Sequence, residues 1–210
     1  MNDQFFVFDD ALNDNDHHKL AKFMKGVLWS NQWSSTQDRP DGQFPEAWHF
    51  NIAFFNAQQG MPSATEEDIE SLRKKGPALL PLWNRVSELT REYLESKYDI
   101  LRYYANCNPF GVNAYIHVDD GDYTAVYYPA TEWNPEWEGG TCFYEKDEEG
   151  RYDAIKYVSY KPNRLIIFPA KIPHRGMPVD KRCLVPRTVL AMKLKLDVNH
   201  SSYMEKMNAK

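Results

Sequence analysis

Two histidines and an aspartate are the residues of this 210-residue chain whose types and order point most directly to chemistry. His117 stands two positions before Asp119, and His174 follows fifty-five residues after that aspartate. Two imidazoles and one carboxylate can occupy one face of an iron(II) ion and leave the opposite positions for a cosubstrate and oxygen. A His-x-Asp pair alone is a weak signal, because such tripeptides arise by chance. The three residues together predict a site for oxygen activation.

The elements around these residues must bring them together. Residues 112–118 are rich in β-branched and aromatic types and predict a strand, in which alternate side chains share one face. His117 and Asp119 would then point the same way, and Asp120 would face elsewhere. The apolar run 165–168 precedes His174, and a histidine just past a buried strand can project its ring into the mouth of a barrel.

Arg187 is the basic residue that directly precedes a further apolar strand, 188–196. A guanidinium aimed into a protein interior is unfavourable unless it meets an anion, and a bidentate pairing with a carboxylate would satisfy it. Arg182 is the alternative, but it lies in the polar turn 179–182. We therefore expect Arg187 to be the residue that binds an anion.

Short strands dominate the second half of the chain, whereas helices dominate the first. Seven strands over about a hundred residues predict an antiparallel jelly roll: 101–107, 112–118, 123–129, 140–145, 155–160, 164–169 and 188–196. Before them the pattern predicts strands at 4–9 and 48–55, a helix after the capping residues 13–16, and helices at 63–75 and 78–98.

These elements predict an α+β fold, a double-stranded β-helix with the N-terminal helices packed on one sheet. We expect one structural domain, in which residues 1–100 support a catalytic core of residues 101–196, followed by a tail of residues 197–210. The polar segment 29–45, which contains Trp33, is a candidate lid. His17 and His18 are expected to be solvated on the first helix.

Composition limits the function classes. The formal charge is −5 and lysines and arginines form no long run, which disfavours a nucleic-acid partner. No apolar run approaches the roughly 20 residues that span a bilayer, and the N-terminus lacks a signal-peptide pattern. The three cysteines are widely spaced and suggest neither a zinc knuckle nor a disulfide scaffold. We expect a soluble, cytoplasmic protein without a membrane partner, and the oligomeric state is not indicated.

Between Leu101 and Leu196 the chain resembles the 2-oxoglutarate and iron(II)-dependent dioxygenases, and within them the prolyl-hydroxylase-like branch. Nearly half of the chain takes part, and the joint pattern is specific although no single piece is. The elements that carry the resemblance follow the family's order: His117-Val118-Asp119, Tyr127-Tyr128-Pro129 followed by Trp133, Gly139-Gly140-Thr141, Arg164-Leu165-Ile166-Ile167-Phe168, His174 with Met177-Pro178, and Arg187 before its strand.

The resemblance implies that His117, Asp119 and His174 bind iron(II), and that Arg187 binds the distal carboxylate of 2-oxoglutarate. Tyr128 would add a hydroxyl to that grip. Relatives usually place the basic residue nearer the second histidine, about where Arg182 stands. Many relatives also have a tyrosine three residues before the His-x-Asp motif, where this chain has Ala114, so the adjacent Tyr115 is the remaining candidate for the cosubstrate pocket.

The implied activity is hydroxylation of an unactivated C–H bond with oxygen and 2-oxoglutarate, giving succinate and carbon dioxide as coproducts. The carboxylate at Asp119 favours hydroxylation over halogenation, because related halogenases lack it to make room for a halide. The resemblance favours a prolyl or other residue of a peptide or protein as substrate, with a free amino acid or small metabolite as the alternative. Two other classes stay open: a non-catalytic cupin-like binding module, and a zinc or manganese enzyme without oxygen chemistry.

Overall fold

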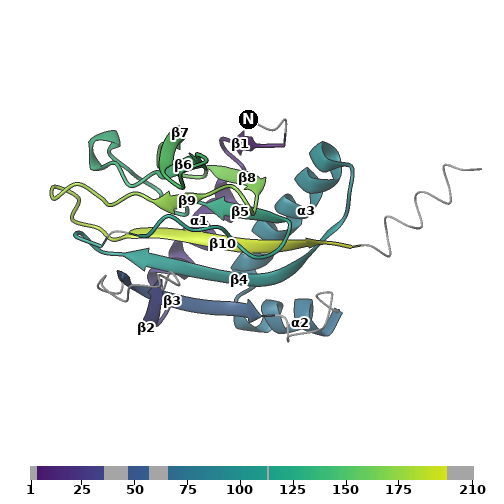
Figure 1. Ribbon diagram of the computed structural model, residues 1–210. Helices are drawn as coiled ribbons and strands as arrows, with labels where there is room; N and C mark the ends of the chain where they lie inside the picture. Colours follow the sequence, from purple (N-terminus) through teal and green to yellow (C-terminus); the bar gives the residue numbers. More distant parts are fainter. Residues whose placement is uncertain (1–3, 36–46, 57–65, 113, 198–210) are drawn as a thin grey trace, which may run out of the picture.

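Two antiparallel sheets make up most of the computed structural model, which describes residues 4–35, 47–56, 66–112 and 114–197 (Figure 1). The larger sheet has seven strands in the order β1-β8-β5-β10-β4-β3-β2, and the smaller has three in the order β7-β6-β9. The strands are β1 Phe6–Phe8, β2 Ser30–Ser35, β3 Ala47–Asn56, β4 Tyr98–Asn108, β5 Tyr123–Tyr127, β6 Thr141–Lys146, β7 Tyr152–Val158, β8 Leu165–Pro169, β9 His174–Gly176 and β10 Arg187–Leu196.

The antiparallel jelly roll predicted from the strand pattern is confirmed. Two expectations about where strands and loops lie were wrong. No named strand covers the described part of 112–118, where His117 makes only an isolated bridge to His174. The first part of the expected loop 29–45 is the strand β2, which pairs with β3, and the rest of the candidate lid, 36–45, lies outside the described residues.

Helices α1 (Asp14–Lys25), α2 (Glu66–Lys75) and α3 (Leu80–Leu94) come from the first half of the chain, with a 3-10 turn at Pro77–Leu79. Asn13 caps α1, its side chain accepting a hydrogen bond from the backbone of Asp16 at 3.0 Å. The helix expected to run to residue 98 stops at Leu94. Glu95 takes a left-handed conformation with φ 51°, and β4 begins three residues later.

The seven-stranded sheet separates two clusters of buried side chains. On one face, helix residues such as Leu20 and Leu82 pack with Tyr103 of β4 and Leu190 of β10. On the other face a smaller cluster combines residues of both sheets: Val126, Tyr128, Phe143, Val158, Tyr160, Ile166, Phe168 and Val189. Alternate residues of β10 therefore face opposite sides of the sheet.

The N-terminal strands belong to the same sheet as the jelly-roll core. Val7 of β1 pairs with Ile166 of β8, and β3 pairs along β4. The expected support region, 1–100, therefore contributes strands as well as helices. In the described part of the chain, no helix is both long and apolar enough to span a membrane. Residues 198–210 of the expected tail lie outside the described residues.

Candidate metal and cosubstrate site

His117, Asp119 and His174 converge, with one potential ligand atom from each lying within 4.8 Å of the others. Backbone hydrogen bonds bring the two segments together: His117 N donates to His174 O at 3.0 Å, and His174 N donates to His117 O at 2.9 Å. Asp119 N donates in turn to Ala170 O at 2.8 Å. The bridge between two segments far apart in sequence thus replaces the strand that we expected around His117.

Both imidazole rings are oriented by a carbonyl two residues earlier. His117 Nδ1 donates to Tyr115 O and His174 Nδ1 donates to Ile172 O, each at 2.9 Å. A carbonyl only accepts, so the proton of a neutral ring lies on Nδ1 and Nε2 is left with its lone pair. The Nε2 atoms lie 3.6 and 3.3 Å from the Asp119 carboxylate oxygens. Metal-binding histidines are held in this way.

The protonation states also suit a divalent metal. Burial, with a smaller contribution from nearby His174, lowers the pKa of His117 to about 4. Burial raises the pKa of Asp119, but Lys193 and the two histidines outweigh that effect and hold this pKa well below its ordinary value. A neutral imidazole and an ionised carboxylate are the forms that bind metal. The donor set therefore fits iron(II).

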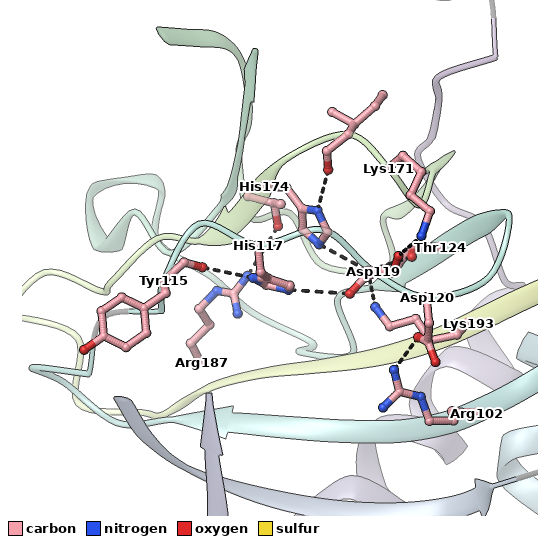
Figure 2. A network of polar contacts seen from close by, with 12 residues as sticks. Arg102, Tyr115, His117, Asp119, Asp120, Thr124, Lys171, His174, Arg187 and Lys193 are labelled. Carbon is pink, nitrogen blue, oxygen red and sulfur yellow. Dashed lines mark hydrogen bonds and ion pairs between the residues drawn. The ribbon is translucent and has the colours of Figure 1, made fainter. Parts of the chain in front are cut away.

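Hydrogen bonds from neighbouring side chains fix the Asp119 carboxylate (Figure 2). Thr124 Oγ1 donates to Oδ2 at 2.7 Å, and the ammonium group of Lys193 contacts the same oxygen. Lys171 Nζ donates to the Asp119 carbonyl oxygen at 3.0 Å. This carboxylate is thus held in place before any metal binds.

Arg187 lines the same cavity of about 450 Å³ as the triad and is only 4% exposed. Its Nε donates to Gly139 O, and its Nη2 lies 3.3 Å from Gly140 O and 3.4 Å from Thr141 Oγ1. In the part of the chain that the structure describes, these contacts leave Nη1 as the edge with free donors. Arg182, by contrast, is 59% exposed and pairs at the surface with Asp180 and Glu136.

The two candidate tyrosines lie differently from the simplest expectation. The Tyr128 side chain is fully buried in the cluster between the sheets, and its hydroxyl pairs with Thr141 Oγ1 at 2.8 Å. Tyr128 is therefore linked to Arg187 through Thr141, whose hydroxyl both side chains contact. The ring of Tyr115 points away from the triad (Figure 2), and its carbonyl is the part that orients His117. Because residues 114–116 form no strand, the alternation that would aim the Tyr115 ring inward is absent.

Sequence reasoning missed several polar residues at the site, among them Arg102, Thr124, Thr141 and Lys193. Lys193 carried a signal, because a lysine inside the apolar run of β10 is unusual for a buried strand. Thr141 was recognised only as part of a motif. Thr124 and Arg102 carry no sequence signal, because a threonine or an arginine in a strand is ordinary.

Comparison with known proteins agrees with this architecture. No family model matches the chain, and a search of curated proteins finds no significant match. Among solved structures, a Trichoplax adhaerens prolyl hydroxylase in complex with a hypoxia-inducible-factor peptide has a TM-score of 0.53 at 15% identity, over 96% of this chain and 87% of its own.

Two bacterial structures are similar over comparable lengths. A Pseudomonas putida prolyl-4-hydroxylase gives a TM-score of 0.53 at 15% identity, over 91% of this chain and 92% of its own. A Burkholderia pseudomallei oxidoreductase of the 2OG-Fe(II) oxygenase family gives a TM-score of 0.62 at 10% identity, over 91% of this chain and 85% of its own. The chain thus has the fold of these oxygenases.

Proposed function

We propose that the protein is an iron(II)- and 2-oxoglutarate-dependent dioxygenase that hydroxylates an unactivated C–H bond. The observation that carries this proposal is the convergence of His117, Asp119 and His174 in one cavity with Arg187. The shared fold supports it, because two of the structural neighbours are prolyl hydroxylases and a third is a 2OG-Fe(II) oxygenase.

Each residue has a definite task in this proposal. His117, Asp119 and His174 would hold the iron, which when bound would activate oxygen together with 2-oxoglutarate and yield succinate and carbon dioxide. Arg187 would hold the distal carboxylate of 2-oxoglutarate through Nη1, while its other nitrogens stay fixed on Gly139 and Gly140. Burial of this arginine keeps water away from the pairing and strengthens it.

For the substrate, we propose a prolyl or other amino-acid residue of a peptide or protein. A structural neighbour was solved with a peptide bound, and two neighbours are named as prolyl hydroxylases. A free amino acid or small metabolite is the second candidate. The observation that favours this candidate is a pair of cations inside the cavity, Lys193 and Arg102.

The test is an anaerobic titration of the metal-free protein with iron(II) and 2-oxoglutarate, followed by the visible charge-transfer band of the chelated ion. We expect a band in the wild type that is lost in His174→Ala, which removes one ligand. Zinc or manganese binding without the band would indicate a metal enzyme without this oxygen chemistry. Absence of any metal binding would leave a cupin-like binding module. Substrates can then be sought by stimulated succinate formation over peptide and amino-acid pools.

A further inference from the structure

Two cationic side chains, Lys193 and Arg102, lie opposite each other at one end of the cavity. Lys193 of β10 and Arg102 of β4 are register partners on adjacent antiparallel strands, and both line the cavity that contains the triad. Side chains at such positions start about 5 Å apart, and like charges there repel each other. An anion between or beside the two cations would relieve this repulsion.

The two cations differ in exposure, since Lys193 is buried and the side chain of Arg102 is 31% exposed. Lys193 is 2% exposed, and burial of an ammonium costs several kcal/mol unless it is paired. Arg102 contacts Asp120, but its Nε is buried and has no hydrogen-bond partner among the described residues. Both cations lie near the ring of Tyr104, at 5.8 Å for Arg102 and 5.6 Å for Lys193. The cluster of Arg102, Tyr104 and Lys193 therefore forms a preformed cationic wall.

The carboxylates beside these two cations also take part in other interactions or are exposed to solvent. Lys193 contacts Asp119, which belongs to the triad, and Arg102 contacts Asp120, whose side chain is 54% exposed. Among the described lysines, arginines and acids that line the cavity, three are cationic (Arg102, Arg187 and Lys193) and two are anionic (Asp119 and Asp120). A divalent metal adds two positive charges and 2-oxoglutarate two negative ones. Counted over these described side chains, one positive charge therefore remains uncompensated in the loaded cavity.

This cationic wall is separate from the place proposed for the cosubstrate. Arg187 and Lys193 are six residues apart on β10, which corresponds to roughly 20 Å along a strand. Figure 2 shows Arg187 beside His117, and Lys193 at the opposite side of the triad beside Asp119. A 2-oxoglutarate held by Arg187 and the triad would thus leave the Lys193 end of the cavity open. This end also has a route from solvent, since Val118 and Asp120 are exposed there.

We infer that Lys193 and Arg102 form a subsite for a carboxylate of the substrate, on the far side of the triad from Arg187. The inference rests on the proposed function and narrows its substrate to a molecule with a free carboxylate near the oxidised carbon. The carboxylate can belong to a free amino acid or to the end of a peptide. The single negative charge of this carboxylate compensates the positive charge that remains in the loaded cavity. Tyr104, whose ring lies near both cations, is a further polar group beside the subsite.

The test measures binding rather than turnover. The full-length protein is loaded with zinc, which does not activate oxygen, and with 2-oxoglutarate, and both affinities are determined first. Ligand-observed NMR then compares a pool of neutral L-amino acids with the pool of their amides. A second arm compares N-acetyl-Gly-Pro-Gly with a free C-terminal carboxylate against the same peptide as its amide. The two arms distinguish a free amino acid from a peptide terminus.

The variants are Lys193→Met and Arg102→Met, with Lys195→Met as the matched control. Among the described residues Arg102 pairs with Asp120 and makes no hydrogen bond to the Asp119 carboxylate, so the Arg102 variant separates carboxylate binding from support of Asp119. Lys195 lies on the same strand but pairs with Asp122 near the surface. Each lost charge-assisted hydrogen bond should weaken carboxylate binding about tenfold or more.

Binding of acids but not amides, weakened in both variants and kept in Lys195→Met, is the expected result. Equal binding of amides, unchanged affinity in Arg102→Met, or absence of carboxylate-dependent binding would overturn the subsite while the proposed function stands. A wild-type protein that binds zinc but not 2-oxoglutarate would refute the proposed function, and the subsite with it.

Discussion

Replacement of Arg187 by methionine should weaken 2-oxoglutarate binding about a hundredfold while the triad keeps its metal. Methionine keeps an unbranched stem about as long as the aliphatic part of arginine but removes the charge and every N–H donor. Arg187 is 4% exposed, so solvent screens its pairing with a carboxylate little. Its Nη1 edge offers two donors, since Nε and Nη2 already face Gly139, Gly140 and Thr141.

The magnitude follows from these two donors. A hydrogen bond to a charged group contributes about 1.5 kcal/mol or more, so two contribute about 3 kcal/mol. Because about 1.4 kcal/mol corresponds to a factor of ten, the dissociation constant should rise about a hundredfold. Metal affinity should change little, because no triad residue takes a hydrogen bond from Arg187 in the described structure.

The assay is anaerobic titration of the iron(II)-loaded protein with 2-oxoglutarate, beside a separate metal titration and a thermal melt. The matched control is Arg182→Met, which removes an arginine paired at the surface with Asp180 and Glu136. An unchanged 2-oxoglutarate affinity in Arg187→Met would refute the reasoning. A loss in Arg182→Met instead would move the clamp to that residue.

Three further predictions concern the support of the site and of the fold. Thr124→Val removes the 2.7 Å hydrogen bond to Oδ2 of the triad aspartate and should weaken metal binding about tenfold in a competition titration, with Thr124→Ser restoring it. Gly176→Ala places a Cβ 2.8 Å from Arg187 Nη1 and should weaken 2-oxoglutarate binding about tenfold with unchanged metal affinity. An unchanged 2-oxoglutarate affinity in this variant would show that the guanidinium can move aside without loss of binding. Arg164 holds the pKa of Asp9 at about 2, below its ordinary 3.8, so Asp9 stabilises the fold above pH 3.8 and this contribution is lost as the pH falls through 2. Asp9→Asn should therefore lower the free energy of unfolding at pH 7 by about 1 kcal/mol, allowing for solvent screening, and acid titration of both proteins should show the difference disappear.

Much of the architecture could be read from local patterns. Alternation of apolar residues and turn signals predicted most of the jelly-roll strands, and the capping residue Asn13 marked the start of α1. Sequence order and residue type also identified the three residues that converge. The predictions failed where pairing between distant segments determines the secondary structure. The segment of β2 is polar in sequence but forms a strand because it pairs with β3. His17, expected to be solvated, is 5% exposed and lies 2.6 Å from the Tyr127 hydroxyl.

The sequence by itself determined which chemical groups the site contains, because residue types and the apolar period are local properties of the chain. It carried His117, Asp119, His174 and Arg187 in an order that allows one cavity. Only the tertiary structure decided that Lys193 faces Arg102, because the register between β10 and β4 depends on pairing across more than eighty residues of chain. That register places two cations on one wall of the cavity, and the substrate preference that we infer follows from their position.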